Sequence, residues 1–249
     1  MTKVFVHGNP ETSAIWSLVV AELVHRDIHD VVLLSPPGFG APTPTGWDAT
    51  QTSYTQWLIQ QLENIGGSID LVGHDWGAGH TYGVVATRPD LVLSWAADCG
   101  GLLDPEYIWH DNARVWQTSE AGEEAIDGFI NMSASDKVAV LISLGMTHDI
   151  AHDVGSALNA EMGRCILALY RSAAQPAMKS LGERLSTTQQ PRGLVIIPTE
   201  DHFPGTPQMA ANTADACGAK TVTLQGLGHW WMIADPILAV DVLTQHWQK

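Results

Sequence analysis

The sequence predicts a doubly wound α/β protein with a mostly parallel sheet, interrupted by a helical insertion. Two observations support this prediction. Short, continuously apolar runs alternate with longer segments of helical periodicity, and this alternation is typical of a parallel sheet covered on both faces. The alternation stops between about residues 104 and 172, where helical patterns follow one another without a strand.

Six runs have the short length and apolar character of strands, and most are predicted to be buried on both faces. They span residues 4–6, 31–34, 69–72, 92–97, 194–197 and 221–224. The helices expected between them span residues 14–25, 51–65, 79–87, 207–217 and 236–247. The order of these elements gives repeated β-α-β units, and therefore the doubly wound sheet.

We therefore expect an α/β core formed by residues 1–103 and 173–249, and a helical cap formed by residues 104–172. Ligands of open parallel sheets bind beyond the carboxyl ends of the strands. An insertion after the fourth strand would cover that crevice as a lid. The alternative is a second helical layer with no role in binding.

The overall composition excludes several classes of function. The 249 residues include 12 Lys and Arg against 27 Asp and Glu, a formal charge of −15, so nucleic acid and anionic membranes would be repelled. Three scattered cysteines argue against a disulfide framework. No apolar run reaches the roughly 18 residues of a membrane span, and no apolar signal core opens the chain. We expect a cytoplasmic monomer or homodimer.

The most informative segment is residues 71–79, LVGHDWGAG, in which a strand ends and a helix begins. Gly73, Asp75 and Gly77 have the spacing of a nucleophile elbow, a strained turn that holds its central residue at the edge of the sheet. The usual central residue is serine, and here it is Asp75. Neither of the common glycine-rich phosphate-binding motifs is present, which disfavours a dinucleotide site.

Two further residues follow strands in the chain order nucleophile, acid, histidine. Asp201 comes after residues 194–197, and His229 comes after residues 221–224. Each would therefore lie at the carboxyl edge of the sheet, beside Asp75. Asp98, after the fourth strand, is a second candidate for the acid.

With these residues and the segment HGNP at positions 7–10, the sequence resembles the α/β-hydrolase superfamily, in its aspartate-nucleophile branch of epoxide hydrolases and haloalkane dehalogenases. Members of that branch usually have two more strands before this loop, so we expect a trimmed sheet of about six strands. A carboxylate is ionised near neutral pH and can displace a leaving group from saturated carbon. The resemblance implies an alkyl ester on Asp75, hydrolysed by water that His229 activates and Asp201 orients.

The resemblance also implies which residues assist the leaving group, and here it points in two directions. Tyr170, in the segment LYR, is similar to the cap tyrosine that assists epoxide opening, and Tyr107 is a doubtful second donor. Asn9 and Trp76 match the pair that holds halide in many haloalkane dehalogenases, and their backbone N–H groups would form the oxyanion hole. We predict epoxide hydrolysis to a vicinal diol. Haloalkane or haloacid dehalogenation is the first alternative, and a catalytically silent ligand-binding protein is the second.

The remaining site predictions concern the pocket and metals. The residues expected to line the pocket are Phe39, Trp109, Trp116, Tyr107 and Trp230, with His110 and His148 as further candidates. Two histidine pairs have the i, i+4 spacing that can bind zinc, but neither has an obvious third ligand: His25 with His29, and His148 with His152. We therefore expect no metal and no cofactor, and a small, apolar, electrophilic substrate.

Overall fold

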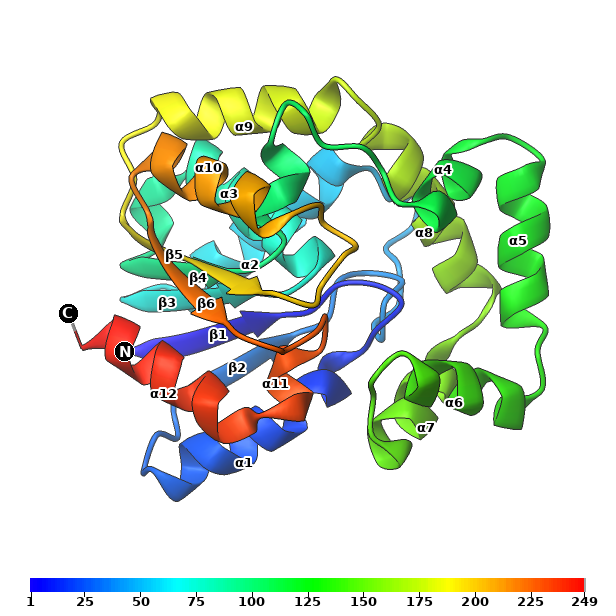
Figure 1. Ribbon diagram of the computed structural model, residues 1–249, viewed down its shortest axis with the longest axis horizontal. Helices are drawn as coiled ribbons and strands as arrows, with labels where there is room; N and C mark the ends of the chain where they lie inside the picture. Colours follow the sequence, from blue (N-terminus) through cyan, green and yellow to red (C-terminus); the bar gives the residue numbers. More distant parts are fainter. Residues whose placement is uncertain (249) are drawn as a thin grey trace.

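The computed structural model describes residues 1–248 and contains a six-stranded, entirely parallel sheet (Figure 1). The strand order is β2-β1-β3-β4-β5-β6, so β1 lies next to the edge strand β2, and β3 to β6 follow in order on its other side. The strands are β1 (Thr2–Val6), β2 (Val31–Leu34), β3 (Ile69–Gly73), β4 (Ser94–Ala97), β5 (Arg192–Pro198) and β6 (Lys220–Leu224).

Helices cover both faces of the sheet (Figure 1). One face carries α2 (Gln51–Ile65), α3 (Trp76–Thr87), α9 (Ala177–Thr187) and α10 (Pro207–Cys217), and the other carries α1 (Ser17–His25), α11 (Trp231–Ala234) and α12 (Pro236–Trp247). Short 3₁₀ helices are η1 (Ser13–Trp16), η2 (Pro89–Leu91) and η3 (Gly100–Leu103). This arrangement gives two hydrophobic cores, one on each side of the sheet.

Local sequence signals fix the ends of several of these helices. Thr50 and Thr206 accept hydrogen bonds from backbone N–H groups in the first turns of α2 and α10. Pro207 occupies the first turn of α10, where its missing N–H costs nothing. Gly218 ends the same helix in a left-handed conformation that a side chain would disfavour.

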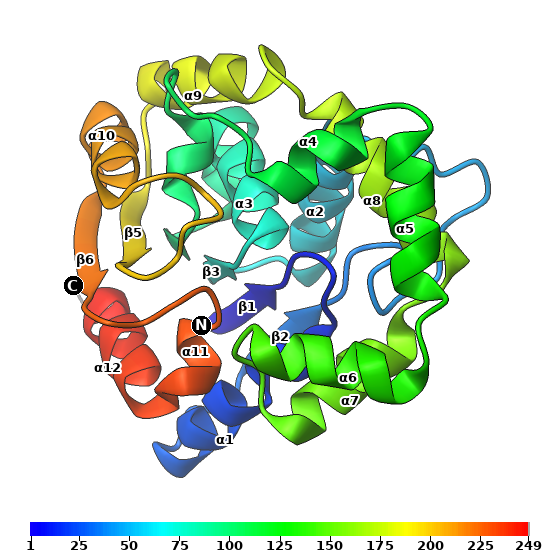
Figure 2. The ribbon, with the colours of Figure 1, turned by 45° about the vertical axis from the view of Figure 1, so that its right-hand side comes forward.

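The cap consists of five helices beyond the carboxyl edge of the sheet, and Figure 2 shows how they lie around it. They are α4 (Asp111–Gln117), α5 (Ala121–Ile130), α6 (Ala134–Ser143), α7 (His148–Ala157) and α8 (Ala160–Ser172). α4, α5 and α8 pack on one another, whereas α6 packs on α7, which also contacts η1. The cap therefore meets both hydrophobic cores of the sheet.

The predicted sheet is confirmed, but burial at its two edges is lower than the apolar pattern suggested. β3 and β4 are buried at every position, whereas β2 and β6 are largely half-exposed or exposed. β2 and β6 are the outer strands, and each has a neighbour on one side only. An apolar run alone does not distinguish an edge strand from a central one.

The expected helices are present, with shifted boundaries and two additions. α3 begins at Trp76 rather than at residue 79, and residues 13–16 form a 3₁₀ turn before α1. α9 and α11 were not predicted from the sequence. Within residues 1–248, no helix is both long and apolar enough to cross a lipid bilayer.

Candidate active site

The turn between β3 and α3 holds Asp75 in a strained backbone conformation. Its φ and ψ are 52° and −122°, an arrangement that a residue with a side chain rarely adopts. The neighbouring glycines make the turn sterically possible: a Cβ atom on Gly77 would lie 2.2 Å from the carbonyl oxygen of Val6, and one on Gly73 would lie 2.5 Å from that of Gly77. The sequence thus forces Asp75 to the carboxyl edge of the sheet.

The two oxygens of the Asp75 carboxylate lie in different surroundings. Oδ1 accepts a hydrogen bond from the backbone N–H of Asn9 at 2.8 Å. A Cβ atom on Gly8 would lie 2.0 Å from this oxygen and 2.5 Å from the backbone nitrogen of Trp76, so only glycine permits the close approach of this loop. Oδ2 lies 3.8 Å from Nε2 of His229. Burial raises the pKa of Asp75 to about 6, although the positive charge of His229 opposes the rise.

His229 and Asp201 form a buried pair beside this carboxylate. Nδ1 of His229 lies 2.8 Å from Oδ2 of Asp201, so this ring nitrogen donates and Nε2 faces Asp75. Burial disfavours the imidazolium, but the charge and hydrogen bond of Asp201 outweigh it and raise the pKa of His229 to about 8. The structure therefore brings Asp75, His229 and Asp201 together from the ends of three strands.

Asp98, the second candidate for the acid, does not contact His229. Its side chain accepts hydrogen bonds from the backbone N–H of Asp75 at 3.0 Å and from Nε1 of Trp231 at 2.7 Å. It also contacts Nδ1 of His74, the residue before Asp75. Asp98 thus holds the elbow, and Asp201 is the carboxylate that orients the histidine.

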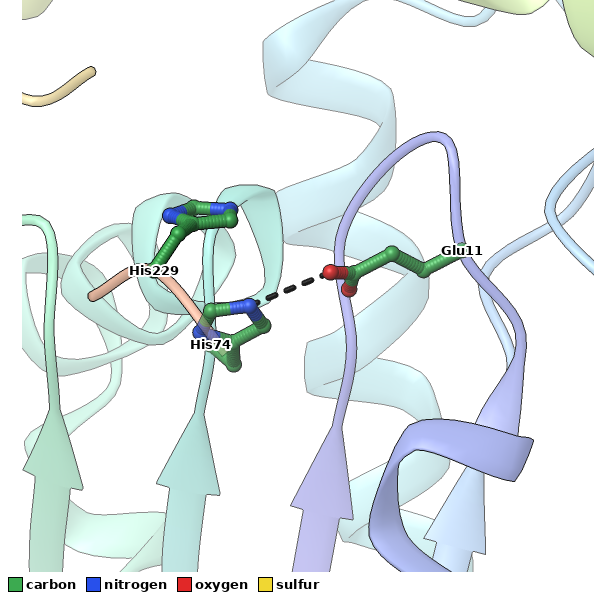
Figure 3. A group of neighbouring side chains, drawn as sticks. All are labelled: Glu11, His74 and His229. Atoms are coloured by element: carbon green, nitrogen blue, oxygen red, sulfur yellow. Dashed lines mark hydrogen bonds and ion pairs between the residues drawn. The ribbon is translucent and has the colours of Figure 1, made fainter. Parts of the chain in front are cut away.

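Sequence reasoning did not identify Glu11 and His74, which lie directly beside the triad. Oε1 of Glu11 lies 3.1 Å from Nε2 of His74, and Figure 3 shows His229 next to this pair. Both side chains are completely buried. The only signals in the sequence are an acidic residue directly after the HGNP segment and a histidine inside the elbow, and nothing in the sequence pairs them.

A cavity of about 260 Å³ opens between the sheet edge and the cap. Of the residues proposed to line the pocket, Trp116 and Trp230 do so, together with Asn9, Asp75, Tyr170 and His229. The further lining residues are Pro10, His110, Asn112, Ala125, Phe129, Val140, Leu141, Leu144 and Phe203. A larger open groove of about 460 Å³ lies between η3, α9 and α10, and contains none of the triad residues.

Four other predicted pocket residues do not line this cavity. Phe39 packs in the core against Tyr54, with ring centroids 5.7 Å apart, and is not among the residues lining the cavity. Tyr107 and Trp109 pack against each other and line a separate, small space of about 10 Å³, which Asp75 and Tyr170 also line. The apolar character of these side chains is used for packing, which the sequence cannot distinguish from pocket lining. His148 is exposed, and it too does not line the cavity.

The polar side chains that the cap supplies to the cavity include Tyr170 and His110. Burial and the nearby charge of Asp75 raise the pKa of the Tyr170 phenol well above its usual value. Nδ1 of His110 accepts a hydrogen bond from the backbone N–H of Ala113, so Nε2 carries the ring proton. Burial lowers the pKa of His110 to about 4, and the ring is neutral near pH 7. Tyr107, the doubtful second donor, instead donates its hydroxyl to the carbonyl of Phe203.

Two groups of potential metal ligands involve His229, and one pair in each group is hydrogen-bonded. Glu11, His74 and His229 form one group and Cys99, Asp201 and His229 the other, with ligand atoms within 4.8 Å of one another. Both ring nitrogens of His74 already contact carboxylate oxygens, so a metal ion would have to displace these contacts. In the described part of the chain, neither predicted histidine pair belongs to a group of three such donors.

Comparison with known proteins places these observations in a family. Residues 4–241 match the model of the alpha/beta hydrolase family. A curated relative, (E)-2-((N-methylformamido)methylene)succinate hydrolase of Acinetobacter baylyi, is 33% identical over 94 residues, which cover 37% of this chain and 35% of the relative. The chain thus matches about a third of that relative's length.

Solved structures share the fold at low sequence identity. Haloalkane dehalogenase DbeA from Bradyrhizobium elkani has a TM-score of 0.75 at 19% identity, covering 99% of this chain and 91% of that one. E-2-(acetamidomethylene)succinate hydrolase has a TM-score of 0.74 at 16% identity, covering 100% and 91%. Cfl2 from Burkholderia cenocepacia has a TM-score of 0.80 at 17% identity, covering 98% and 87%. The chain belongs to the alpha/beta hydrolase family.

Proposed function

We propose that this hydrolase opens small, apolar epoxides to vicinal diols through a covalent ester on Asp75. One observation carries the proposal: the strained elbow presents a carboxylate whose Oδ1 accepts the Asn9 N–H, while its Oδ2 faces His229. A carboxylate needs no base to become a nucleophile, so it can attack saturated carbon directly. Tyr170 and His110 line the same cavity, where Tyr170 can protonate the departing oxygen and His110 can donate a hydrogen bond to it.

The first half-reaction forms the ester. Oδ2 of Asp75 attacks a ring carbon of the epoxide, and the bond between that carbon and the ring oxygen breaks. The ring oxygen takes a proton from the hydroxyl of Tyr170, while Nε2 of His110 donates a hydrogen bond to it. The product is a hydroxyalkyl ester, with Oδ1 as its carbonyl oxygen in the hydrogen bond of Asn9.

The second half-reaction hydrolyses the ester. The negative charge of Asp75 helps to keep His229 protonated. Esterification removes this charge, and the imidazole of His229 is then more readily neutral. Nε2 then takes a proton from water, and the hydroxide attacks the carbonyl carbon of the ester. The N–H groups of Asn9 and Trp76 stabilise the negative charge on Oδ1. When the tetrahedral intermediate collapses, the bond between its carbon and the alkyl oxygen breaks, and the imidazolium of His229 protonates that oxygen to release the diol. The proton left on the carboxyl group returns to the tyrosinate of Tyr170, which restores the carboxylate of Asp75 and the neutral His229.

The walls of the cavity support a small and apolar substrate. Several apolar lining residues come from α5, from α6 and from the position directly after α6: Phe129, Val140, Leu141 and Leu144. The volume of about 260 Å³ lies below the range typical of sites for drug-sized ligands.

Dehalogenation is the second candidate, and the side chain of Asn9 favours it. Both polar atoms of this amide are buried without a hydrogen-bond partner in the described chain, although Asn9 lines the cavity. The indole of Trp76 packs beside Tyr170, with ring centroids 5.3 Å apart. The free amide N–H groups of Asn9 suit a departing halide as well as an oxygen, whereas Trp76 does not line this cavity.

The test uses a His229→Phe variant, in which the ester forms but cannot be hydrolysed. The variant is incubated separately with styrene oxide and with 1-bromobutane, and intact-mass analysis and peptide mapping locate the adduct. We expect a hydroxyalkyl ester on Asp75 after styrene oxide. A butyl ester formed only after 1-bromobutane would instead establish dehalogenation.

The matched control is the double variant Asp75→Ala, His229→Phe, which should gain no mass with either reagent. An adduct in this control would mean that another side chain had been alkylated. No adduct in the single variant with a panel of small epoxides and halides would contradict both activities. That result would favour a catalytically silent ligand-binding protein.

A further inference from the structure

Beneath the triad lies a second group of charged residues, Glu11, His74 and Asp98, which we call the buried array. Glu11 follows β1, His74 follows β3 and Asp98 follows β4, so the array joins three loops at the carboxyl edge of the sheet. All three residues are completely buried. Figure 3 shows Glu11 and His74 in contact, with His229 beside them.

The two carboxylates fix the protonation state of His74. Asp98 contacts Nδ1 and Glu11 contacts Nε2, so each ring nitrogen faces a carboxylate oxygen. Because a carboxylate only accepts hydrogen bonds, both nitrogens must carry protons. Burial alone would lower the pKa of His74, but the two carboxylates raise it well above its usual value. The array therefore carries two negative charges, on Glu11 and Asp98, and one positive charge, on His74.

Each carboxylate of the array also holds parts of the triad in place. Asp98 accepts the backbone N–H of Asp75, the nucleophile. Glu11 accepts the backbone N–H of Gly8 at 2.9 Å, next to the oxyanion-hole residue Asn9. It also accepts the indole N–H of Trp230, the residue after His229. The array therefore connects the nucleophile, the oxyanion hole and the base.

The array is close enough to His229 to influence its charge. The ring centroids of His74 and His229 are 4.6 Å apart. A carboxylate oxygen of Glu11 lies within 4.8 Å of a ring nitrogen of each histidine. A lone imidazolium at this distance would oppose protonation of His229. The two carboxylates of the array offset that effect, so removing either one should leave the site more positive.

We propose that Glu11, His74 and Asp98 are positioning residues, a permanently charged unit that orients Asp75 and sets the charge experienced by His229. The inference rests on the proposed function, because it gives His229 the role of the base. If the array sets the charge at the site, neutralising one of its carboxylates should favour loss of a proton from His74 or His229. If the array only holds the loops in place, the same change should leave the titration of the two histidines unaltered. The titratable groups that face His229 come from every neighbouring element: Glu11, His74, Asp75, Asp98, Cys99, His110 and Asp201.

The experiment measures histidine titration by ¹H–¹⁵N NMR in the whole protein without substrate. In the native protein we expect both nitrogens of His74 to stay protonated from pH 6 to pH 8. In Glu11→Gln, the first deprotonation of the coupled pair His74 and His229 should move to lower pH by roughly 1. Asp98→Asn should move it in the same direction.

The matched control is Asp70→Asn, which neutralises an equally buried carboxylate on β3 that is paired with Lys3 rather than with a histidine. This control should leave the pair's titration unchanged. A neutral His74 at pH 7 in the native protein would overturn the proposal, even if neither array variant folds. So would an unchanged titration in both array variants. Because no substrate is present, a failure of the Asp75 chemistry would show in the adduct experiment and not here.

Discussion

The two sides of the candidate active site are built differently. On the sheet edge, Asp201, His229 and the buried array are almost completely buried, and the side chain of Asp75 is 14% exposed. Each of these residues takes part in at least one charged hydrogen bond. On the cap, Tyr170 and His110 are held mainly by aromatic packing, with ring centroids 6.2 Å apart. The cap also leaves several large apolar side chains exposed, among them Ile142 and Leu144.

This difference assigns separate tasks to the two regions. Pre-organised charges lower the barrier of the reaction, and they need a rigid, water-poor surrounding. Apolar contacts and single proton donors select which leaving group and which substrate are accepted. We therefore expect changes at the sheet edge to abolish turnover, and changes in the cap to alter its rate and selectivity.

The largest effect should come from Asp75→Ala. Without the carboxylate no ester forms, and kcat/KM on a styrene oxide assay should fall by at least about 10⁴-fold. Circular dichroism checks that the variant is folded. Retention of full turnover would contradict the role of Asp75 and the assignment of the chemistry to the sheet edge.

Tyr170→Phe should have the next largest effect, and it should depend on the leaving group. Loss of a proton donor costs roughly 10²–10⁴-fold, so alkylation by the epoxide should slow by about 10²-fold. Alkylation by 1-bromobutane should change little, because bromide needs no proton. The ratio of the two single-turnover rates is the measurement. Equal losses with both reagents would indicate that Tyr170 only shapes the cavity.

The pH dependence tests the surroundings of Asp75. Its pKa is raised to about 6, and only the carboxylate attacks. The alkylation rate should therefore be constant above that pH and fall by about tenfold per pH unit below it. Stopped-flow measurement of ester formation between pH 4 and pH 8 checks this. A midpoint near 4, the ordinary range for aspartate, would show that burial does not perturb the nucleophile.

The last prediction uses packing variants to compare the stability of the two regions. Trp16 is completely buried beside Phe5, and Trp16→Ala should lower the free energy of unfolding by about 3–5 kcal/mol. Trp116 in the cap is half-buried, and Trp116→Ala should cost about 1 kcal/mol. Urea unfolding measures both, and equal costs would remove the distinction between a rigid core and a looser cap.

The same contrast explains what could be predicted from the sequence. The strands, the elbow and the positions of Asp201 and His229 follow from local patterns, because strand ends in a parallel sheet meet at one edge. Glu11 and Asp98 could not be paired with His74, because their contacts join loops that are distant in the chain. Phe39 shows the converse problem, since burial in a core and lining of a pocket require the same apolar side chains.

The most direct test of the central claim is a single turnover in H₂¹⁸O with enzyme in excess over styrene oxide. If Oδ2 of Asp75 attacks the epoxide, the new oxygen of the first diol comes from the protein. The diol should then be unlabelled, and mass analysis of the peptide containing Asp75 should find the ¹⁸O in its carboxylate. Label in the diol of the first turnover, with none in Asp75, would mean that water attacks the substrate directly and would contradict the covalent mechanism.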